Sequence, residues 1–103
     1  MPSREQLEKL LKAEPDDIFL NFGLAMELSK ANLTDEAITR FDRVIQLDPT
    51  YTAAYYHQGN TLIALGRNEE AKPILQAGVE ATRQAGNPHA ESEMQALLDG
   101  IES

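Results

Sequence analysis

Residues recur along this chain at a fixed separation of 34 positions, beginning with Pro15 and Pro49. The other matched pairs are Leu28 and Leu62, Asn32 and Gly66, Glu36 and Glu70, Ala37 and Ala71, Phe41 and Leu75, and Ile45 and Val79. A period of this length is typical of proteins built from repeated supersecondary units. Because one such unit cannot bury its apolar face alone, the period predicts units that stack on their neighbours.

The stretch 52–84 shows what one unit contains. After the turn at Gly66, apolar or small residues recur at steps of three and four, which is the stripe of a helix with one buried face. They are Ala71, Ile74, Leu75, Gly78, Val79 and Thr82. Before the turn the same spacing joins Tyr55, Gly59, Leu62 and Leu65. The unit is therefore predicted to be a helical hairpin whose small residues lie where the helices approach most closely.

The preceding unit begins with a helix expected over 17–31 that carries two apolar stripes. The first is Leu24, Ala25 and Leu28, and the second is Phe19, Phe22 and Met26. One stripe must pack on the neighbouring helix, while the other packs elsewhere or forms a surface for a partner. Asn32 is expected to end this helix in a left-handed conformation. Thr34 is expected to cap the next helix, whose buried face is Ala37, Ile38, Phe41, Val44 and Ile45.

Shorter helices are expected at both ends. Ser3 and Gln6 form the pattern of a capping box at the start of a helix over 3–13, and Pro15 ends it. Its apolar edge is Leu7, Leu10 and Leu11. Asp16 or Asp17 is expected to cap the helix that follows.

The last helix is expected over about 88–101, with Asn87 as its cap and Pro88 at its first position. Its inward residues are Ala90, Met94, Leu97, Leu98 and Ile101, and its solvated face carries Glu91, Glu93, Gln95 and Asp99. Pro73 breaks the pattern in the helix before it, because proline removes a backbone hydrogen bond and crowds the turn at Glu69. We therefore expect a late start or a slight bend there.

These residues resemble tetratricopeptide repeats. The first copy matches that pattern at Asn21, Leu24, Ala25, Leu28, Ala37, Phe41 and Pro49, and the second at Tyr55, Gln58, Gly59, Leu62, Gly66, Ala71 and Leu75. Three positions depart from it: Asn21 replaces an aromatic residue, Gln58 replaces a large apolar residue, and Arg83 stands where a closing proline is usual.

The resemblance implies an all-α fold, a short TPR-like α-solenoid of antiparallel helical hairpins with a C-terminal capping helix. We expect one domain over 1–103. Its parts are an N-terminal half-repeat helix at 3–15, repeats at 18–51 and 52–85, and the capping helix at 87–101. The initial methionine and the capping helix favour a complete unit over a slice of a longer array.

Composition restricts the partners. The chain has 103 residues, a formal net charge of -8 and no cysteine. The negative charge argues against nucleic acid and anionic membrane surfaces, and no apolar run approaches the roughly 18 residues of a membrane span. Without cysteine, neither a disulfide framework nor a thiolate metal site can form, which fits a reducing cytoplasm. We expect a cytoplasmic location and neutral or basic protein partners.

No catalytic constellation is evident. The two histidines, His57 and His89, do not show the spacing of a zinc site, and the scattered glycines form no phosphate-binding loop. His57 beside Tyr56 could act as a general base, but no nucleophile motif accompanies them. The plainer interpretation is a partly exposed histidine on a helix face. We predict no catalytic residue, no cofactor and no metal.

In tetratricopeptide proteins, the first helix of each hairpin lines a concave groove that takes peptides or helices. By position, the resemblance implies groove residues Phe19, Phe22, Met26 and Lys30 in the first repeat and Tyr56, His57, Asn60 and Ile63 in the second. Phe19, Phe22 and Ile63 could instead pack under flanking helices. Met26 and Tyr56 suit a groove better, because methionine adapts to varied partners and tyrosine joins an apolar face to a polar tip.

Asn60 could hydrogen-bond a peptide backbone through both halves of its amide. Some tetratricopeptide proteins bind acidic C-terminal tails of chaperones through a clamp of lysine, asparagine and arginine, and only Asn60 matches it here. Phe22 and Met26 occupy clamp positions, and Glu91 and Glu93 stand where basic residues would be needed. A carboxylate clamp is therefore not expected.

Three functions follow from these patterns. The first is a protein–protein interaction module, a scaffold or adaptor that binds a peptide or helix on its concave face. The second is self-association, in which Leu7, Leu10 and Leu11 pack against another copy. The third, an enzyme that uses Tyr56 and His57, predicts a deep pocket for a small ligand.

Overall fold

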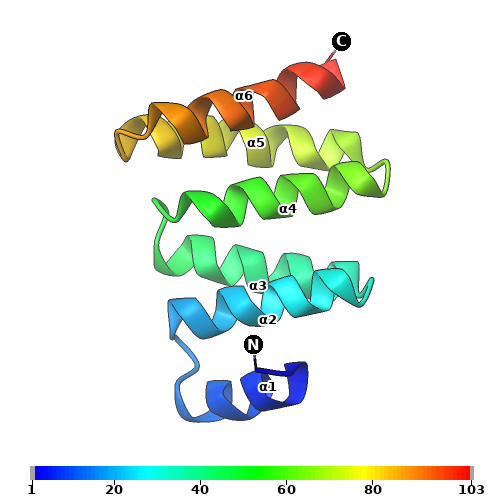
Figure 1. Ribbon diagram of the computed structural model, residues 1–103, viewed down its shortest axis with the longest axis vertical. Helices are drawn as coiled ribbons and strands as arrows, with labels where there is room; N and C mark the ends of the chain where they lie inside the picture. The colour runs from blue at the N-terminus through cyan, green and yellow to red at the C-terminus, as the bar shows by residue number, and fades with distance from the viewer. Residues whose placement is uncertain (1, 103) are drawn as a thin grey trace. The chain divides into compact units, whose positions relative to one another are not determined.

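The computed structural model describes residues 2–102, and within that range it contains six α-helices and no strand (Figure 1). The helices are α1 (Arg4–Ala13), α2 (Ile18–Lys30), α3 (Thr34–Leu47), α4 (Thr52–Ala64), α5 (Asn68–Gln84) and α6 (Pro88–Glu102). The predicted all-α fold is confirmed. The 34-residue period is visible in the bounds themselves, since α4 repeats the limits of α2 and α5 begins 34 residues after α3.

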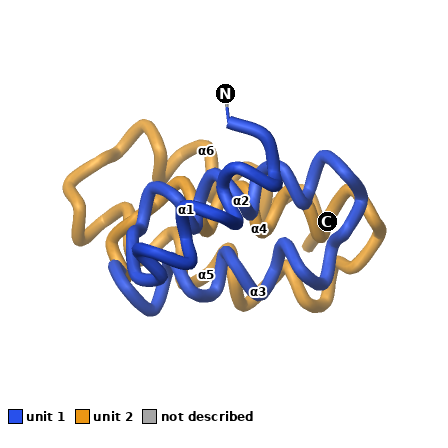
Figure 2. Tube along the Cα trace, turned by 90° about the horizontal axis from the view of Figure 1, so that it is seen from below, with its two compact units in different colours: residues 1–48 blue, residues 49–103 orange. Residues whose placement is uncertain are grey.

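The chain divides into two compact units, Met1–Asp48 and Pro49–Ser103, which Figure 2 shows in blue and orange. We call them unit 1 and unit 2. In unit 1, α2 and α3 pack together as a hairpin and α1 packs on α2. In unit 2, α5 packs against both α4 and α6, and α6 also contacts α4. That the units form one domain over 1–103 stays a prediction.

The helix starts of unit 1 follow from local side chains. Gln6 N–H donates to Ser3 Oγ at 3.2 Å and Ser3 N–H donates to Gln6 Oε1 at 2.8 Å, which is the predicted capping box. At the start of α2 the cap is Asp17, whose Oδ1 accepts from Leu20 N–H at 2.8 Å. Asp16, the other candidate, instead forms an ion pair with Arg43 of α3.

One turn geometry recurs three times. The residues after α2, α4 and α5 include Asn32, Gly66 and Gly86, with φ of 61°, 73° and 67°. This left-handed conformation is open to glycine and tolerated by asparagine. The next N–H then reaches back to close the helix, as in Arg67 N–H donating to Leu62 O at 2.9 Å. Asn32 therefore ends α2 as predicted.

The same turn explains why Thr34 is not a cap. Leu33 N–H closes α2 by donating to Leu28 O at 2.9 Å, and Leu33 O already accepts from Ala37 N–H at 2.9 Å. Leu33 thus occupies the N-cap position without a side-chain hydrogen bond, and Thr34 is the first residue of α3. The prediction that Thr34 caps α3 was wrong by one position.

The core of unit 1 lies between its three helices. Its buried apolar residues are Leu7, Leu11, Leu24, Ala25, Leu28, Ala37, Phe41 and Val44. Leu10 is 48% exposed and does not join them. The first predicted stripe of α2 is therefore the core stripe.

Asn21 is the polar member of this core, with no exposed surface. Its Nδ2 donates to Pro15 O at 3.0 Å and to Asp17 O at 2.8 Å, and its Oδ1 accepts from Arg40 Nη1 at 3.1 Å. A buried amide is stable only when such partners satisfy it. These bonds explain how asparagine can stand where the family pattern has an aromatic residue.

Unit 2 packs around small residues. A Cβ atom built on Gly59 would lie 2.5 Å from Leu75 Cδ2 of α5. One built on Gly78 would lie 2.2 Å from Met94 Sδ of α6 and 2.8 Å from Tyr55 Cβ of α4. All three distances are shorter than any normal contact. The two glycines therefore allow α4, α5 and α6 to approach closely, as the hairpin pattern predicted for Gly59.

Two details of α5 and α6 concern prolines. α5 begins at Asn68 and contains Pro73 without interruption, so the predicted late start was wrong. Arg67 O already accepts from Ala71 N–H at 3.2 Å, which starts the helix before the proline is reached. The alternative, a slight bend, stays a prediction. At α6, Asn87 Oδ1 accepts from Ala90 N–H at 3.1 Å and the helix begins at Pro88, as predicted.

Candidate functional site

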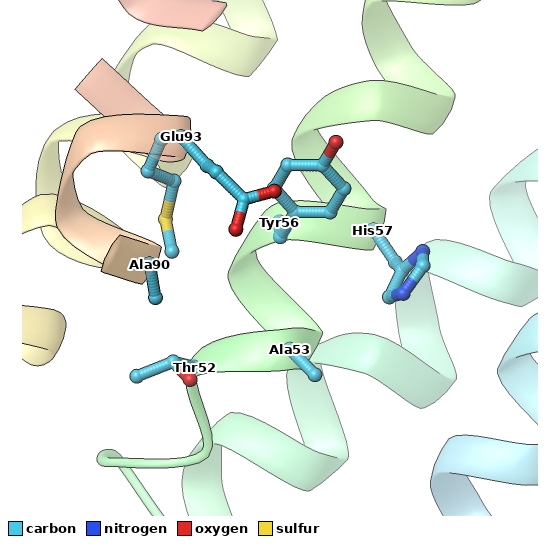
Figure 3. Close-up of a pocket in the computed structure, with 7 residues that line it drawn as sticks. Thr52, Ala53, Tyr56, His57, Ala90 and Glu93 are labelled. Atoms are coloured by element: carbon cyan, nitrogen blue, oxygen red, sulfur yellow. The ribbon is translucent and has the colours of Figure 1, made fainter. Parts of the chain in front are cut away.

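A cavity of about 200 Å³ lies in unit 2 between α4 and α6 (Figure 3). Its lining residues are Thr52, Ala53, Tyr56 and His57 from α4 and Ala90, Glu93 and Met94 from α6. Tyr56 and His57 are among the residues that the sequence placed in a partner-binding groove. The small side chains of Ala53 and Ala90 face this space from the two helices, which leaves room between them.

Helical periodicity orients the α4 wall. Tyr55, Gln58 and Gly59 are buried in unit 2, so Tyr56 and its neighbour His57 project to another side of α4. The two rings pack edge to face, with centroids 5.4 Å apart and planes at 87°. This arrangement fixes both rings and leaves each half-buried.

The α6 side of the cavity supplies a carboxylate, from Glu93, and an apolar side chain, from Met94. Glu93 is exposed, and in Figure 3 its side chain extends from α6 toward α4, whose Tyr56 lines the same cavity. Its Oε1 is 3.1 Å from Nε2 of His89, one turn earlier on α6. Met94 is buried and adds an apolar side chain to the lining.

Burial lowers the pKa of His57 below its ordinary value, because the desolvated site disfavours the charged imidazolium. At neutral pH the ring is therefore neutral, with one nitrogen that donates and one that accepts. The site thus combines an aromatic face, a neutral imidazole and a carboxylate around an apolar floor.

The other predicted residues of α4 continue the same face outside the cavity. Asn60 is exposed one turn after Tyr56, and Ile63 is half-buried in the following turn. Both remain available beside the cavity, although neither lines it.

The predicted residues of α2 have mixed surroundings. Phe19 is 77% exposed, Met26 is half-buried, and Lys30 forms an exposed ion pair with Glu27 at 3.6 Å. Phe22 packs edge-on against Phe41 of α3, with ring centroids 6.1 Å apart. The sequence left open whether Phe22 packs internally, and this contact shows that its ring belongs in part to the hairpin core.

Glu93 is exposed, as its predicted place on the solvated face of α6 requires, but the sequence did not predict that it also lines the cavity. Ala53 and Thr52 were not singled out at all. The spacing of α4 could have indicated Ala53, which stands three residues before Tyr56. The opposing position of Glu93 had no such signal, because it depends on how α6 rotates against α4.

Among residues 2–102, no group of three or more His, Cys, Asp or Glu side chains is arranged to hold a metal ion. Within the same residues, no helix has the length and apolarity needed to cross a membrane.

Comparison with known proteins identifies the family. The tetratricopeptide repeat model matches residues 28–98. The chain belongs to the tetratricopeptide repeat family. A TPR repeat-containing protein of Pseudomonas aeruginosa is 30% identical over 94 residues, which cover 91% of this chain and 90% of that protein. A peroxisomal targeting signal receptor of Candida albicans is 33% identical over 69 residues, 67% of this chain but only 12% of the receptor.

Solved structures of the tetratricopeptide class share the fold. A tetratricopeptide repeat domain protein of Salinibacter ruber superposes with a TM-score of 0.77 at 31% identity, covering 85% of this chain and 89% of its own. The TPR2B domain of yeast Sti1, determined as a pHsp70 complex, gives a TM-score of 0.86 at 22% identity, with 96% and 79% covered. The repeat predicted from the 34-residue period is thus confirmed as a tetratricopeptide repeat.

Proposed function

We propose that this tetratricopeptide protein is a protein–protein interaction module, a scaffold or adaptor that captures a peptide or helix of a partner on α2 and α4. The observation that supports it most is the cavity beside Tyr56 and His57, on the helix whose face the family pattern assigns to partners. An apolar floor with a few polar groups at its edge is typical of a site that anchors one side chain of a ligand.

Further candidate contact residues lie on α2 of unit 1 and on α4 of unit 2. Phe19 presents a large apolar side chain to solvent at the first turn of α2, and Met26 lies half-buried two turns later. On α4, the exposed amide of Asn60 can donate to and accept from a peptide backbone. Lys30, Ile63 and Phe22 complete the proposed surface, Phe22 only with the part of its ring that Phe41 leaves accessible.

The relatives support a protein or peptide partner. One is named as a receptor for a peroxisomal targeting signal, and one structural neighbour was determined in complex with pHsp70. The charge of -8 favours neutral or basic partners for this chain. We propose a cytoplasmic location, which the absence of cysteine supports.

A role without catalysis fits the site better than an enzyme. The cavity of about 200 Å³ is smaller than the roughly 300–1,000 Å³ of sites that enclose small-molecule ligands. Tyr56 and His57 meet there edge to face, and the lining contains no serine, cysteine or lysine; its hydroxyl and carboxylate side chains besides Tyr56 are Thr52 and Glu93. We propose that both side chains contact a partner and that no cofactor is required.

A peptide library displayed on phage tests this function. The wild-type chain should select peptides that bind saturably, and Met26→Asp combined with Tyr56→Asp should weaken them at least tenfold while helicity stays unchanged. The matched control is Thr39→Asp combined with Gln76→Asp, two exposed positions on α3 and α5. Retained affinity in the first double variant would show that these faces of α2 and α4 are not the binding surface.

Self-association is the second candidate function, and the structure reduces the number of predicted leucines that could contact another copy. Leu7 and Leu11 are buried against the rest of unit 1, so they are not available to another copy. Leu10 remains, at a hollow of about 730 Å³ on α1 that Pro2, Gln6, Lys9 and Ala13 also line. If Leu10 drives dimer formation, light scattering over a concentration series should show mass growth that Leu10→Lys removes. A constant monomer mass would rule it out.

A further inference from the structure

We infer that the cavity between α4 and α6 receives a positively charged side chain of the partner, and that arginine fits it best. This inference rests on the proposed function, because it names the chemistry that the binding site selects. It is carried by a single small cavity whose lining combines the Tyr56 ring and the Glu93 carboxylate with the apolar side chains of Ala53, Ala90 and Met94 (Figure 3).

The walls match the two parts of such a side chain. Ala53, Ala90 and Met94 offer apolar surface to a methylene stem. Tyr56 offers a ring over which a cation is attracted, and Glu93 offers a carboxylate that can accept hydrogen bonds from the same cation. Arginine can use both at once, because its planar guanidinium stacks on a ring while its N–H groups reach a carboxylate.

The charge of Glu93 is not neutralised by the lysine and arginine side chains of unit 2, each of which pairs with another carboxylate. Arg67 bonds to Glu70 at 2.6 Å. Lys72 contacts Glu69 at 3.4 Å. Arg83 bonds to Glu91 at 2.7 Å.

The two histidines of unit 2 are His89, which contacts Glu93, and His57, which lines the same cavity. His89, which is largely exposed, contacts Glu93 at 3.1 Å and adds positive charge only when it is protonated. His57 lines the cavity, and its burial lowers its pKa, so the imidazole does not repel an incoming cation at neutral pH. A carboxylate of an acidic peptide, by contrast, would meet the like charge of Glu93.

The equivalent positions of α2 in unit 1 hold different side chains. The position 34 residues before Ala53 is Phe19, and the one before Tyr56 is Phe22. Both are phenylalanines, so α2 repeats the helix face with bulky apolar side chains in place of an open, polar-edged cavity. The site for a cation is therefore a local property of α4 and α6 and not of the repeat itself.

The test uses N-acetyl-arginine methylamide as the probe and the citrulline analogue, which has the same shape without the charge, as its control. Wild-type protein labelled at methionine and alanine methyl groups should show saturable NMR shifts at Met94, Ala53 and Ala90 with the arginine probe. We expect the citrulline probe to bind about threefold to tenfold more weakly, the range of one partly exposed cation–π and carboxylate pair.

Variants separate the parts of the site. Glu93→Gln should reduce arginine binding part of the way to the level of citrulline, because the Tyr56 ring still attracts the cation, whereas Glu102→Gln, the same charge change further along α6, should not reduce it. Tyr56→Phe should keep the affinity and Tyr56→Leu should lose it, since the ring and not the hydroxyl attracts the cation. Ala53→Phe should abolish binding by filling the cavity, with helicity as the check that the variant is folded.

Two results would overturn the inference: equal binding of the citrulline and arginine probes, or unchanged arginine binding in Glu93→Gln. The phage-displayed library distinguishes this failure from failure of the proposed function. Selected peptides that bind α4 without any preference for basic residues would leave the interaction function standing and remove the cation site. A library that yields no peptide would remove the function itself.

Discussion

The two helical hairpins, α2–α3 and α4–α5, make the same hydrogen bond with different side chains. Asn21 Nδ2 donates to Pro15 O at 3.0 Å, and 34 residues later Tyr55 Oη donates to Pro49 O at 2.7 Å. Both bonds tie the first helix of a hairpin to the turn that precedes it. The repeat therefore conserves a contact, while the residue that makes the contact changes from a small amide to a large ring.

A change of this size requires compensation in the facing helix. Gly78, whose missing Cβ leaves room for Tyr55, repeats the position of Val44. Val44 is fully buried in unit 1, where the smaller Asn21 stands in place of the ring. The α4–α5 hairpin thus pairs the large Tyr55 with the small Gly78, whereas the α2–α3 hairpin pairs the smaller Asn21 with the larger Val44. Close packing requires this compensation of volumes.

The faces available to partners differ as well. Unit 2 has its third helix beside α4, where Tyr56 and Glu93 line a cavity. In unit 1 the residue equivalent to Tyr56 is Phe22, whose ring packs on Phe41 within the hairpin. Equivalent positions of the repeat therefore have different surroundings in the two copies. Four predictions test how the two hairpins differ.

The largest effect is expected at the closest approach of α4 and α5. Gly59→Leu should lower the free energy of unfolding by about 3 kcal/mol, the upper end of overpacking, because even its Cβ would lie 2.5 Å from Leu75. Chemical denaturation measures the change. Gly100→Leu on α6 is the control, since a Cβ there meets nothing within 4 Å, and it should be neutral or slightly stabilising. Equal stability of the two variants would refute the close-approach interpretation.

The second prediction tests whether the side-chain volumes at positions 21 and 44 compensate for each other, as those of Tyr55 and Gly78 do in unit 2. Asn21→Tyr alone should cost about 1–3 kcal/mol, because the ring meets Val44 and the amide bonds of Asn21 are lost. Adding Val44→Gly should recover part of this loss, with a coupling of at least about 0.5 kcal/mol in a double-mutant cycle. If the effects of the two substitutions on the free energy of unfolding were strictly additive, the volumes at positions 21 and 44 would not compensate for each other.

The third prediction isolates the repeated hydrogen bond. Tyr55→Phe keeps the ring over Gly78 but removes the donor to Pro49 O, and should cost about 1 kcal/mol. Urea denaturation of the variant gives the value. No measurable loss would mean that the ring, and not the hydroxyl, is what unit 2 requires at this position.

The smallest effect is a dependence of stability on pH. It is expected from unit 2 alone at this position, since His57 of unit 2 repeats the position of Gly23 in unit 1. Burial lowers the pKa of His57 in the folded state, below about 6.5 in the unfolded chain. As pH falls through about 6.5, the unfolded state binds the proton first, so the free energy of unfolding should decrease. It should decrease less in His57→Gln.

An NMR titration of the histidine ring protons checks this directly. With His57→Gln to assign the two resonances, the midpoint of His57 should lie below about 6.5. A midpoint at or above that value would contradict the desolvation that its position on α4 implies.

The sequence alone determined most of the local structure of this protein, although it misplaced the cap of α3 and the start of α5. The left-handed turns, the capping box at Ser3, the cap at Asn87 and the helical hairpins were predictable, because each depends on hydrogen bonds within a few residues. Periodicity also identified the buried stripe Leu24, Ala25 and Leu28, since helical spacing alone gathers these residues on one face.

Only the tertiary structure decided which apolar or charged residues meet. Asp16 pairs with Arg43 and Phe22 packs on Phe41, and in both cases the partner lies about twenty or more residues further along the chain. Glu93 lies at the cavity because α6 contacts α4 as well as α5. Spacing along one helix fixes directions only relative to that helix, whereas a site between helices depends on their mutual rotation, which small residues such as Gly78 permit.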